Sequence, residues 1–230
     1  MSDPSLTSAR SRLDARTRQL EALVRERISD KDPSHDWSHV QRVVRNAIRL
    51  CDGSPAQLDI VVAAALLHDL VNLPKHHEDR REASRRSAAM AVELLAECGY
   101  TDNETKLIRT AIEEHSYSLK MAPSTEASAL LQDADRLDAL GAIGIFRAAT
   151  CGTLMGATYY NPEDPFATGR PLDDKHYTLD HFFTKLLLLE QGFNTQAGRT
   201  EARKRTAFMR SFLAELSREI GDDRDSPPAA

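Results

Sequence analysis

The sequence has few of the residues that disulfide-stabilised and thiolate-metal proteins require. Its 230 residues include three cysteines, Cys51, Cys98 and Cys151, and contain no C-x-x-C pair. An odd number of widely spaced cysteines predicts neither a disulfide framework nor a thiolate zinc site. Any metal ion is therefore expected to be held by nitrogen and oxygen atoms.

Long apolar runs and a positive net charge are absent as well. No apolar stretch reaches the length of a transmembrane helix, and residues 1–20 are too polar to include the apolar part of a signal peptide. The net charge of −5 gives no general attraction to nucleic acid or to an anionic membrane. We therefore expect a cytoplasmic protein with neither as a partner. An anionic substrate would need a local positive site, such as a metal ion with a few basic residues.

The sequence also lacks internal repeats, sustained heptads and alternating strand patterns, whereas helical spacing of apolar residues recurs along it. These features predict an all-α fold. Helices are expected at residues 8–28, 38–50, 60–73, 80–98, 102–117 and 126–150, followed by a long loop at 151–177, then helices at 179–194 and 195–220.

The domain organisation follows from the change in composition near residue 150. Residues 1–150 are expected to form the core, residues 151–220 a smaller helical extension packed on it, and residues 221–230 a disordered tail. The amphipathic first and last helices could support a homodimer.

Residues 60–73 form a nearly continuous apolar run that is interrupted only by His68, Asp69 and Asn72. The run is too short to cross a bilayer and is typical of a buried helix. Burying a carboxylate is costly unless it is paired or binds a metal. Taken alone, however, a His-Asp pair at a helix end more often reaches water, so the rest of the chain must decide between these interpretations.

Two further groups of polar residues lie on other predicted helices. His35 precedes the second helix, which Asp36 or Ser38 could cap, and His39 lies in its first turn. Histidines at a helix start are commonly exposed or capping. Asp133, Asp135 and Asp138 lie on the helix that begins near residue 126. Asp135 and Asp138 would be neighbours at i and i+3, so that one could bind a metal while the other supports it or the substrate.

Together, His39, His68, Asp69 and Asp135 place two imidazoles and two carboxylates on three predicted helices. This ligand set suits Mn²⁺, Fe²⁺, Co²⁺, Ni²⁺ or Zn²⁺, and its carboxylates could also take Mg²⁺. An ion held between three helices would keep coordination positions for water and substrate, as hydrolysis requires.

The order and spacing of these residues resemble the H, HD and D elements of the HD-domain phosphohydrolase superfamily. The motifs are HDWSHVQRV at 35–43, ALLHDL at 65–70 and DADRLDAL at 133–140. The sequence is similar to a bacterial subgroup of stand-alone HD hydrolases, in which some members act as nucleotide pyrophosphohydrolases. The similarity covers residues 31–144 and continues into RPLDDK at 170–175 and LDHFFTKLL at 179–187.

This resemblance implies an HD-domain helical bundle, with residues 1–150 as the hydrolase core and a smaller C-terminal helical extension. It makes His39, His68, Asp69 and Asp135 the ligands of one divalent ion. We expect Mn²⁺ first, with Mg²⁺, Co²⁺, Ni²⁺, Fe²⁺ and Zn²⁺ as alternatives. Asp138 would then orient a ligand or contact the substrate.

The residues that would act on the substrate are less strongly indicated. Lys75 and His115 are the candidates for catalysis. Lys75 would stabilise the charge on the phosphate, and His115 would act either as the proton donor to the leaving group or as a phosphate contact. His35 could position the substrate. Each also has an exposed-loop or capping explanation. Some family phosphatases that act on nucleoside monophosphates have a glutamate four residues after the HD histidine, where this chain has Asn72. Asn72 cannot transfer a proton, which argues against that chemistry.

The expected function is a metal-dependent phosphohydrolase acting on a phosphorylated small molecule, first a nucleoside triphosphate pyrophosphohydrolase. A phosphodiesterase or phosphomonoesterase of the same superfamily is the alternative within the enzyme class. Outside it, the same ligands could form a non-catalytic metal and nucleotide sensor. An all-α interaction module that uses the basic last helix is disfavoured by the acidic overall charge.

Overall fold

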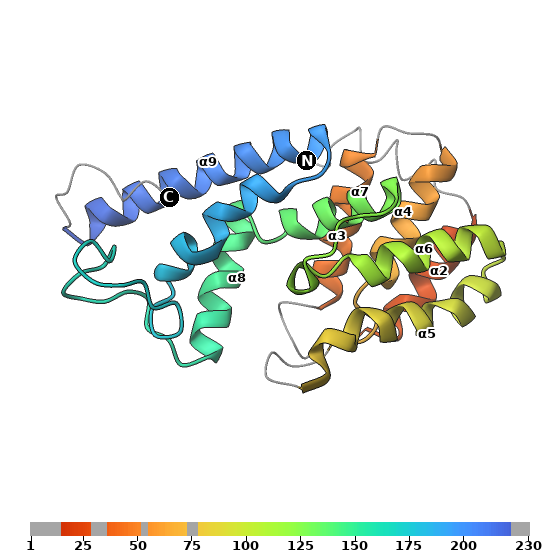
Figure 1. Cartoon of the computed structure of the whole chain (residues 1–230), viewed down its shortest axis with the longest axis horizontal. Helices are drawn as coiled ribbons and strands as arrows, with labels where there is room; N and C mark the ends of the chain where they lie inside the picture. The colour runs from red at the N-terminus through yellow and green to blue at the C-terminus, as the bar shows by residue number, and fades with distance from the viewer. Residues whose placement is uncertain (1–14, 29–35, 52–54, 73–77, 222–230) are drawn as a thin grey trace. The chain divides into compact units, whose positions relative to one another are not determined.

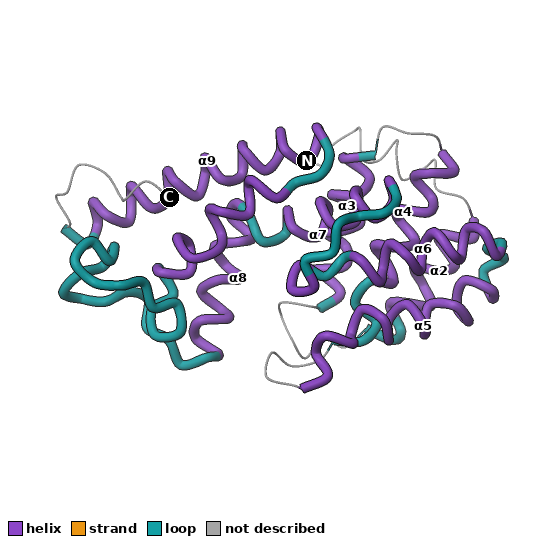
Figure 2. The backbone as a smooth tube through the Cα atoms, in the orientation of Figure 1, coloured by secondary structure: helices purple, strands orange, loops and turns teal. Residues whose placement is uncertain are grey.

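The computed structural model describes residues 15–28, 36–51, 55–72 and 78–221. In these ranges the chain forms helices and loops without a strand, and its one β pairing is an isolated bridge between Thr158 and Tyr177 (Figure 2). The predicted all-α fold is therefore confirmed. The predicted disordered tail lies outside the described residues from residue 222 onward.

The chain forms two compact units, residues 1–135 and residues 136–230. Their junction falls inside helix α7 (Glu126–Leu137), earlier in the chain than the predicted domain boundary at residue 150. The division into a hydrolase core and an extension remains a prediction, because compactness does not report on function.

Helix α4 is the most deeply buried helix of the first unit. Every residue from Val61 to His68 exposes 1% or less of its surface. Helices α2, α3, α5 and α6 all pack against α4 (Figure 1). The elements of this unit are α2 (Ala15–Arg25), α3 (Trp37–Leu50), α4 (Pro55–Leu67), η1 (Glu78–Glu82), α5 (Ala83–Glu97), α6 (Asp102–Glu114), η2 (Tyr117–Leu119) and α7 as far as residue 135.

Capping side chains set where two of these helices begin. The Asp36 carboxylate accepts a hydrogen bond from the His39 backbone N–H at 2.8 Å, so that α3 begins at Trp37 and His39 lies in its first turn. At α6, Thr101 and Glu104 form a reciprocal capping box. The predicted cap at Asp36 is confirmed.

Several predicted helices end earlier than their apolar patterns suggest, among them α2, which ends at Arg25 instead of residue 28. α4 ends at Leu67 instead of residue 73, and α6 ends at Glu114 instead of residue 117. The segment 126–150 is divided into α7 and α8 by a turn at 138–140, which contains Asp138. Gly141 has φ of +72° at the start of α8, a conformation that lets the chain turn between the two helices.

A buried polar network connects α2 to α4 and α6. The Arg16 guanidinium donates to Glu104 at 2.7 Å and to Asp59 at 3.3 Å, and it lies 4.2 Å from the centre of the Tyr100 ring. The buried Thr17 hydroxyl donates to Asp59 at 2.6 Å. The bonds from Arg16 hold the pKa of Glu104 at about 2, below its usual 4.5.

The second unit is built on the long helix α9, which packs against α8 and η4. Arg205 of α9 donates to the Leu137 carbonyl at 2.6 Å. A side chain at Gly141 would lie 3.3 Å from the Cβ of Arg205, so glycine also allows this close approach. The elements are the end of α7, then α8 (Gly141–Leu154), η3 (Phe182–Leu186), η4 (Leu187–Gly192) and α9 (Gln196–Glu219).

The predicted long loop after α8 is present and is held by side chains. The fully buried Asp180 accepts hydrogen bonds from Arg170 at 2.6 Å and 2.8 Å, and the Arg170 guanidinium lies 4.5 Å from the centre of the Tyr177 ring. Asp164 accepts from the backbone N–H of Gly169 at 2.7 Å. The loop is therefore ordered by a buried ion pair and by local turns.

The helix predicted at 179–194 is wound irregularly, as the π-helical turn η3 followed by the 3-10 segment η4. Phe182 and Phe183 are both buried, as are Leu186 and Leu187. The irregular winding places both of these neighbouring pairs in the interior of the second unit.

Among the described residues, no single helix is both long enough and apolar enough to cross a membrane. Helices α7 and α8, which are bent by 67° relative to each other, reach that length and apolar character only when the two are counted as one segment.

The Arg16–Glu104 pair predicts a stability that falls with acid. Because the pKa of Glu104 is lowered from 4.5 to about 2, the stabilisation is complete above pH 4.5 and is lost as the pH falls toward 2. Glu104→Gln should lower the free energy of unfolding at pH 7 by about 1–2 kcal/mol and weaken its decline below pH 4.5. Urea denaturation as a function of pH measures both effects.

The matched control is Glu113→Gln, which removes the exposed pair with Arg109 on the same helix. An exposed i,i+4 pair contributes about 0.5 kcal/mol or less. Equal losses in the two variants would contradict a specific contribution from Arg16.

Candidate metal centre

The end of α4 brings two polar side chains into a buried region. The helix stops just before His68, so that His68 and Asp69 lie in the turn that follows. His68 Nδ1 lies 2.8 Å from the Ala65 carbonyl oxygen, and the Val71 backbone N–H donates to the Ser87 hydroxyl of α5 at 3.0 Å. These two bonds hold the turn and orient the His68 ring.

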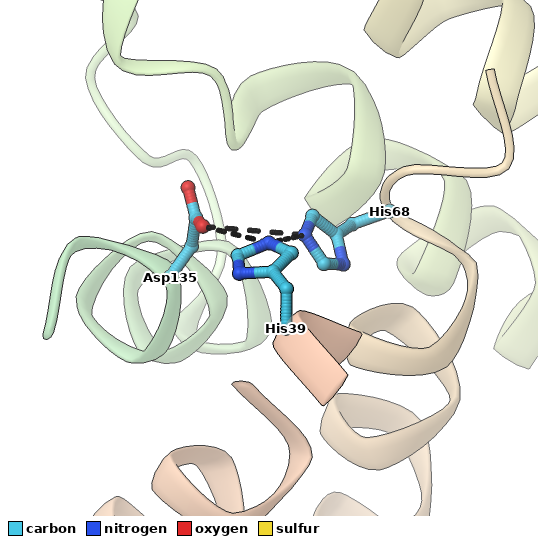
Figure 3. Close-up of side chains that lie close together, drawn as sticks. All are labelled: His39, His68 and Asp135. Atoms are coloured by element: carbon cyan, nitrogen blue, oxygen red, sulfur yellow. Dashed lines mark hydrogen bonds and ion pairs between the residues drawn. The ribbon is translucent and has the colours of Figure 1, made fainter. Parts of the chain in front are cut away.

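His39, His68 and Asp135 point toward one another from α3, the end of α4 and α7 (Figure 3). The Nε2 atoms of the two histidines are 3.2 Å apart. His39 Nε2 lies 3.6 Å from a carboxylate oxygen of Asp135 and 3.6 Å from one of Asp69. His68 Nε2 lies 3.5 Å from the same oxygen of Asp69 and 4.0 Å from that of Asp135. The four side chains named by the sequence motifs therefore converge.

The hydrogen bond of His68 determines which of its nitrogens faces this cluster as an acceptor. A carbonyl oxygen can only accept, so Nδ1 carries the proton that is donated to Ala65, and Nε2 presents a lone pair. Burial lowers the pKa of His68 below 6.5, which keeps its ring neutral at pH 7. A neutral imidazole oriented by a backbone carbonyl is the usual form of a metal-binding histidine.

Asn46 supports the cluster and was not identified from the sequence. It is buried two turns after His39 on α3, and its side-chain amide donates to the Ala134 carbonyl at 2.9 Å. Ala134 is next to Asp135 and within the last turn of α7, where carbonyls lack intrahelical partners. The bond thus ties the helix of His39 to that of Asp135. A polar residue on the buried face of an amphipathic helix was the available signal.

The donor set fits a divalent ion. Ligand atoms about 2.0–2.2 Å from one ion lie roughly 3.0–3.5 Å apart when they occupy neighbouring positions. The separations of 3.2–3.6 Å around His39 Nε2 are close to that range. Two imidazoles and two carboxylates suit Mn²⁺, Fe²⁺, Co²⁺, Ni²⁺ and Zn²⁺ in particular, and the arrangement does not select among them.

His115 brings a third imidazole to the same place. It follows the last residue of α6 and exposes 6% of its surface. Its Nδ1 donates to the Ile112 carbonyl at 2.6 Å, and its Nε2 lies 3.8 Å from the second carboxylate oxygen of Asp69. The His68 and His115 rings are 5.1 Å apart in an edge-on arrangement. His68, Asp69 and His115 thereby form a second group of donors that could hold an ion.

Three further residues were predicted to act at the site, namely His35, Lys75 and Asp138. His35 and Lys75 lie outside the described residues. Asp138 belongs to the second unit, exposes 1% of its surface and forms an ion pair with Arg147. Asp138 follows the last residue of α7 and therefore lies in the turn after this helix, instead of on it as predicted. Its role toward the substrate remains a prediction.

Comparisons with known proteins agree with the motifs. The family model of the HD domain matches residues 36–140. The chain is 32% identical over 207 residues to the uncharacterized protein YpgQ of Bacillus subtilis (strain 168), a match that covers 88% of this chain and 92% of YpgQ.

Solved structures show the same similarity in three dimensions. The structure of Bacillus subtilis YpgQ in complex with ADP is 29% identical, covers 89% of this chain and 94% of YpgQ, and superposes with a TM-score of 0.67. An HD-superfamily hydrolase from Bacillus thuringiensis is 30% identical, covers 89% of this chain and 96% of its own, and gives a TM-score of 0.68. With a relative at this identity and coverage and with the motif residues converged, the chain belongs to the HD-domain superfamily.

Proposed function

We propose that this protein is a metal-dependent phosphohydrolase that cleaves a nucleotide, and that a nucleoside triphosphate pyrophosphohydrolase is the first candidate. The observation that carries the proposal is the meeting of His39, His68, Asp69 and Asp135. Each histidine Nε2 lies within 4.0 Å of both carboxylates. Such a nitrogen and oxygen set keeps open positions for water and substrate, as metal-assisted hydrolysis requires.

The nucleotide assignment is supported by a relative. Bacillus subtilis YpgQ, which is similar along 89% of this chain, has been solved in complex with ADP. A nucleotide presents several anionic phosphate oxygens, and the chain as a whole is acidic, with a net charge of −5. A local cation would therefore be needed to bring such a substrate to these side chains.

The ion, when bound, would polarise a phosphoryl oxygen and make a coordinated water a stronger nucleophile. His39 and His68 would hold it with neutral rings, and Asp69 and Asp135 would offset its charge. His115 presents Nε2 beside Asp69, at 3.8 Å, where it could give a proton to the leaving group or contact a phosphate oxygen. We keep Lys75 and His35 as proposed contacts to the phosphates.

The metal assignment predicts a gain in thermal stability on binding. Mn²⁺ added to the metal-free protein at about a hundred times its Kd should stabilise the fold by about 2.7 kcal/mol, which appears as a higher Tm. His39→Gln and Asp135→Asn should lose most of this rise, because the first replaces an imidazole nitrogen with a weaker amide donor and the second removes the negative charge of the carboxylate. Scanning fluorimetry and elemental analysis of bound metal measure the effect.

His176→Gln is the control for the loss of an imidazole. His176 is exposed and pairs with Asp173 in the second unit, so this variant should keep the full rise in Tm. If His39→Gln and Asp135→Asn respond to Mn²⁺ as strongly as the control, the proposed ligand set is wrong.

The reaction is identified by its products. With Mn²⁺ we expect the protein to release pyrophosphate from nucleoside triphosphates, and Asp69→Ala to reduce turnover by more than about a hundredfold, the upper range for losing a residue that merely supports a ligand. A panel of nucleotides, monoesters and diesters, with phosphate and pyrophosphate assayed separately, makes the measurement.

The panel also separates the alternatives. Release of phosphate alone, or cleavage of diesters in preference to triphosphates, would replace the pyrophosphohydrolase with another member of the hydrolase class. A protein whose Tm rises with Mn²⁺ and nucleotide but which turns over nothing on the panel would be a sensor instead of an enzyme.

A further inference from the structure

His115 lies at the start of a turn that connects α6 to α7 and that has little regular structure. The turn contains only the short helix η2 (Tyr117–Leu119) and passes through Lys120, whose φ is +52°. The backbone N–H of His115 is 3.5 Å from the Ile112 carbonyl, a long hydrogen bond. The backbone of His115 is therefore held only weakly by α6, whose firmer contact is the bond from the His115 ring to the Ile112 carbonyl at 2.6 Å, and contacts from outside α6 can contribute to its position.

Gln132 of α7 supplies two of these contacts. It exposes 1% of its surface, and its side-chain Nε2 donates to the Glu114 carbonyl at 2.8 Å and to the Met121 carbonyl at 3.0 Å. A glutamine amide has two donor hydrogens. Both are accounted for by carbonyls that lie on either side of the segment 115–120.

Glu114 holds the far end of the same turn. Its carboxylate is buried and accepts from the Ser124 backbone N–H at 2.9 Å. Burial opposes its ionisation, but hydrogen bonds from Ser124 and Ser128 outweigh that effect and lower the pKa of Glu114 below its usual value. The turn is thus closed at both ends by buried hydrogen bonds.

The bond from Gln132 acts directly on the peptide unit that carries His115. The Glu114 carbonyl and the His115 N–H belong to one planar peptide, so fixing that carbonyl also fixes the N–Cα bond of His115, from whose Cα the side chain extends. Gln132 is also three residues before Asp135 on α7, and residues at this spacing lie on the same side of a helix. One helix face therefore presents Asp135 to the cluster and holds the turn of His115.

We infer that Gln132 is a positioning residue. It holds His115 Nε2 beside the carboxylate of Asp69, on the same side of α7 as Asp135. The inference rests on the proposed function in one respect, namely that His115 acts on the substrate. The bonds of Gln132 that bear on the turn of His115 are those to the Glu114 and Met121 carbonyls. Its effect on the reaction would pass through the placement of His115, since a misplacement of about 1 Å can reduce a rate about a hundredfold.

The first test compares Gln132→Met and Gln132→Glu with the wild type. Both variants keep the length of the side chain, and both lose the amide donors. We expect kcat to fall about ten- to a hundredfold, with KM and the Kd for Mn²⁺ changed by less than about threefold. A parallel loss of metal affinity would show that α7 as a whole is disturbed and would overturn the inference.

The matched control is Thr17→Val, which also removes a buried hydrogen-bond donor from the first unit, at the contact with Asp59. This variant should lower Tm as the Gln132 variants do and leave kcat unchanged. An equal fall in kcat for Thr17→Val at the same loss of stability would attribute the effect of Gln132 to stability alone.

A double-mutant cycle with His115→Ala identifies the route of the effect. If Gln132 acts through His115, Gln132→Met should reduce kcat in the wild-type background and change it by less than about twofold in His115→Ala. Equal reductions in both backgrounds would overturn the inference.

A measurement on the metal-free protein separates this inference from the proposed function. The bond to Ile112 places a proton on His115 Nδ1, and long-range ¹H–¹⁵N spectra report the tautomer of each imidazole. We expect one tautomer of His115 in the wild type and a mixture in Gln132→Met. An unchanged signal would overturn the positioning role even if the enzyme is active, and a changed signal would support it even if no substrate is turned over.

Discussion

Two imidazole nitrogens held 3.2 Å apart inside the protein are the constraint on which the rest of the first unit depends. His68 Nε2 faces this contact with a lone pair, because its other nitrogen donates to a carbonyl. A neutral His39 ring that carries its proton on Nε2 donates a hydrogen bond to this lone pair, and a bound cation would take the place of that proton. The carboxylates of Asp69 and Asp135 lie within 4.0 Å of both and favour the cation.

The surrounding helices keep that arrangement in place despite its cost. Polar groups without partners would be expensive in the interior. The apolar length of α4 buries His68, the cap at Asp36 sets the first turn of α3, and Asn46 links α3 to the last turn of α7. Each of the four side chains in the candidate metal centre therefore comes from a segment whose position does not depend on a bound ion. A preformed site of this kind needs little reorganisation to bind a metal.

Much of this could be predicted from the sequence, because the relevant signals are local. The run 60–73 indicated a buried helix, and the motif residues His39, His68, Asp69 and Asp135 meet as expected. The exact ends of helices were not predictable in the same way. His68 lies just after α4, and η3 replaces a regular helix, because contacts with segments distant in the sequence, which a local pattern does not contain, decide where a helix ends and how it is wound.

The residues that support the site were missed for a different reason. Asn46 donates to a backbone carbonyl 88 residues away in the sequence. Gln132 donates to two carbonyls, 18 and 11 residues away. Every residue has a backbone carbonyl, so no sequence motif identifies the carbonyl to which a distant side chain binds. Only their type was visible, as polar residues where an apolar face was expected.

Helix α7 contributes more to the candidate site than the carboxylate of Asp135. Its last turns include Asp135, and the Ala134 carbonyl there accepts a hydrogen bond from Asn46. One turn earlier, the Gln132 amide donates to the Glu114 carbonyl, next to His115. A shift of α7 along its axis would therefore move a ligand and a candidate catalytic histidine together. Because these contacts are buried hydrogen bonds with fixed geometry, the helix resists such a shift. The placement of His115 beside Asp69 thus depends on contacts from α7 as well as on the bond from its ring to Ile112 of α6.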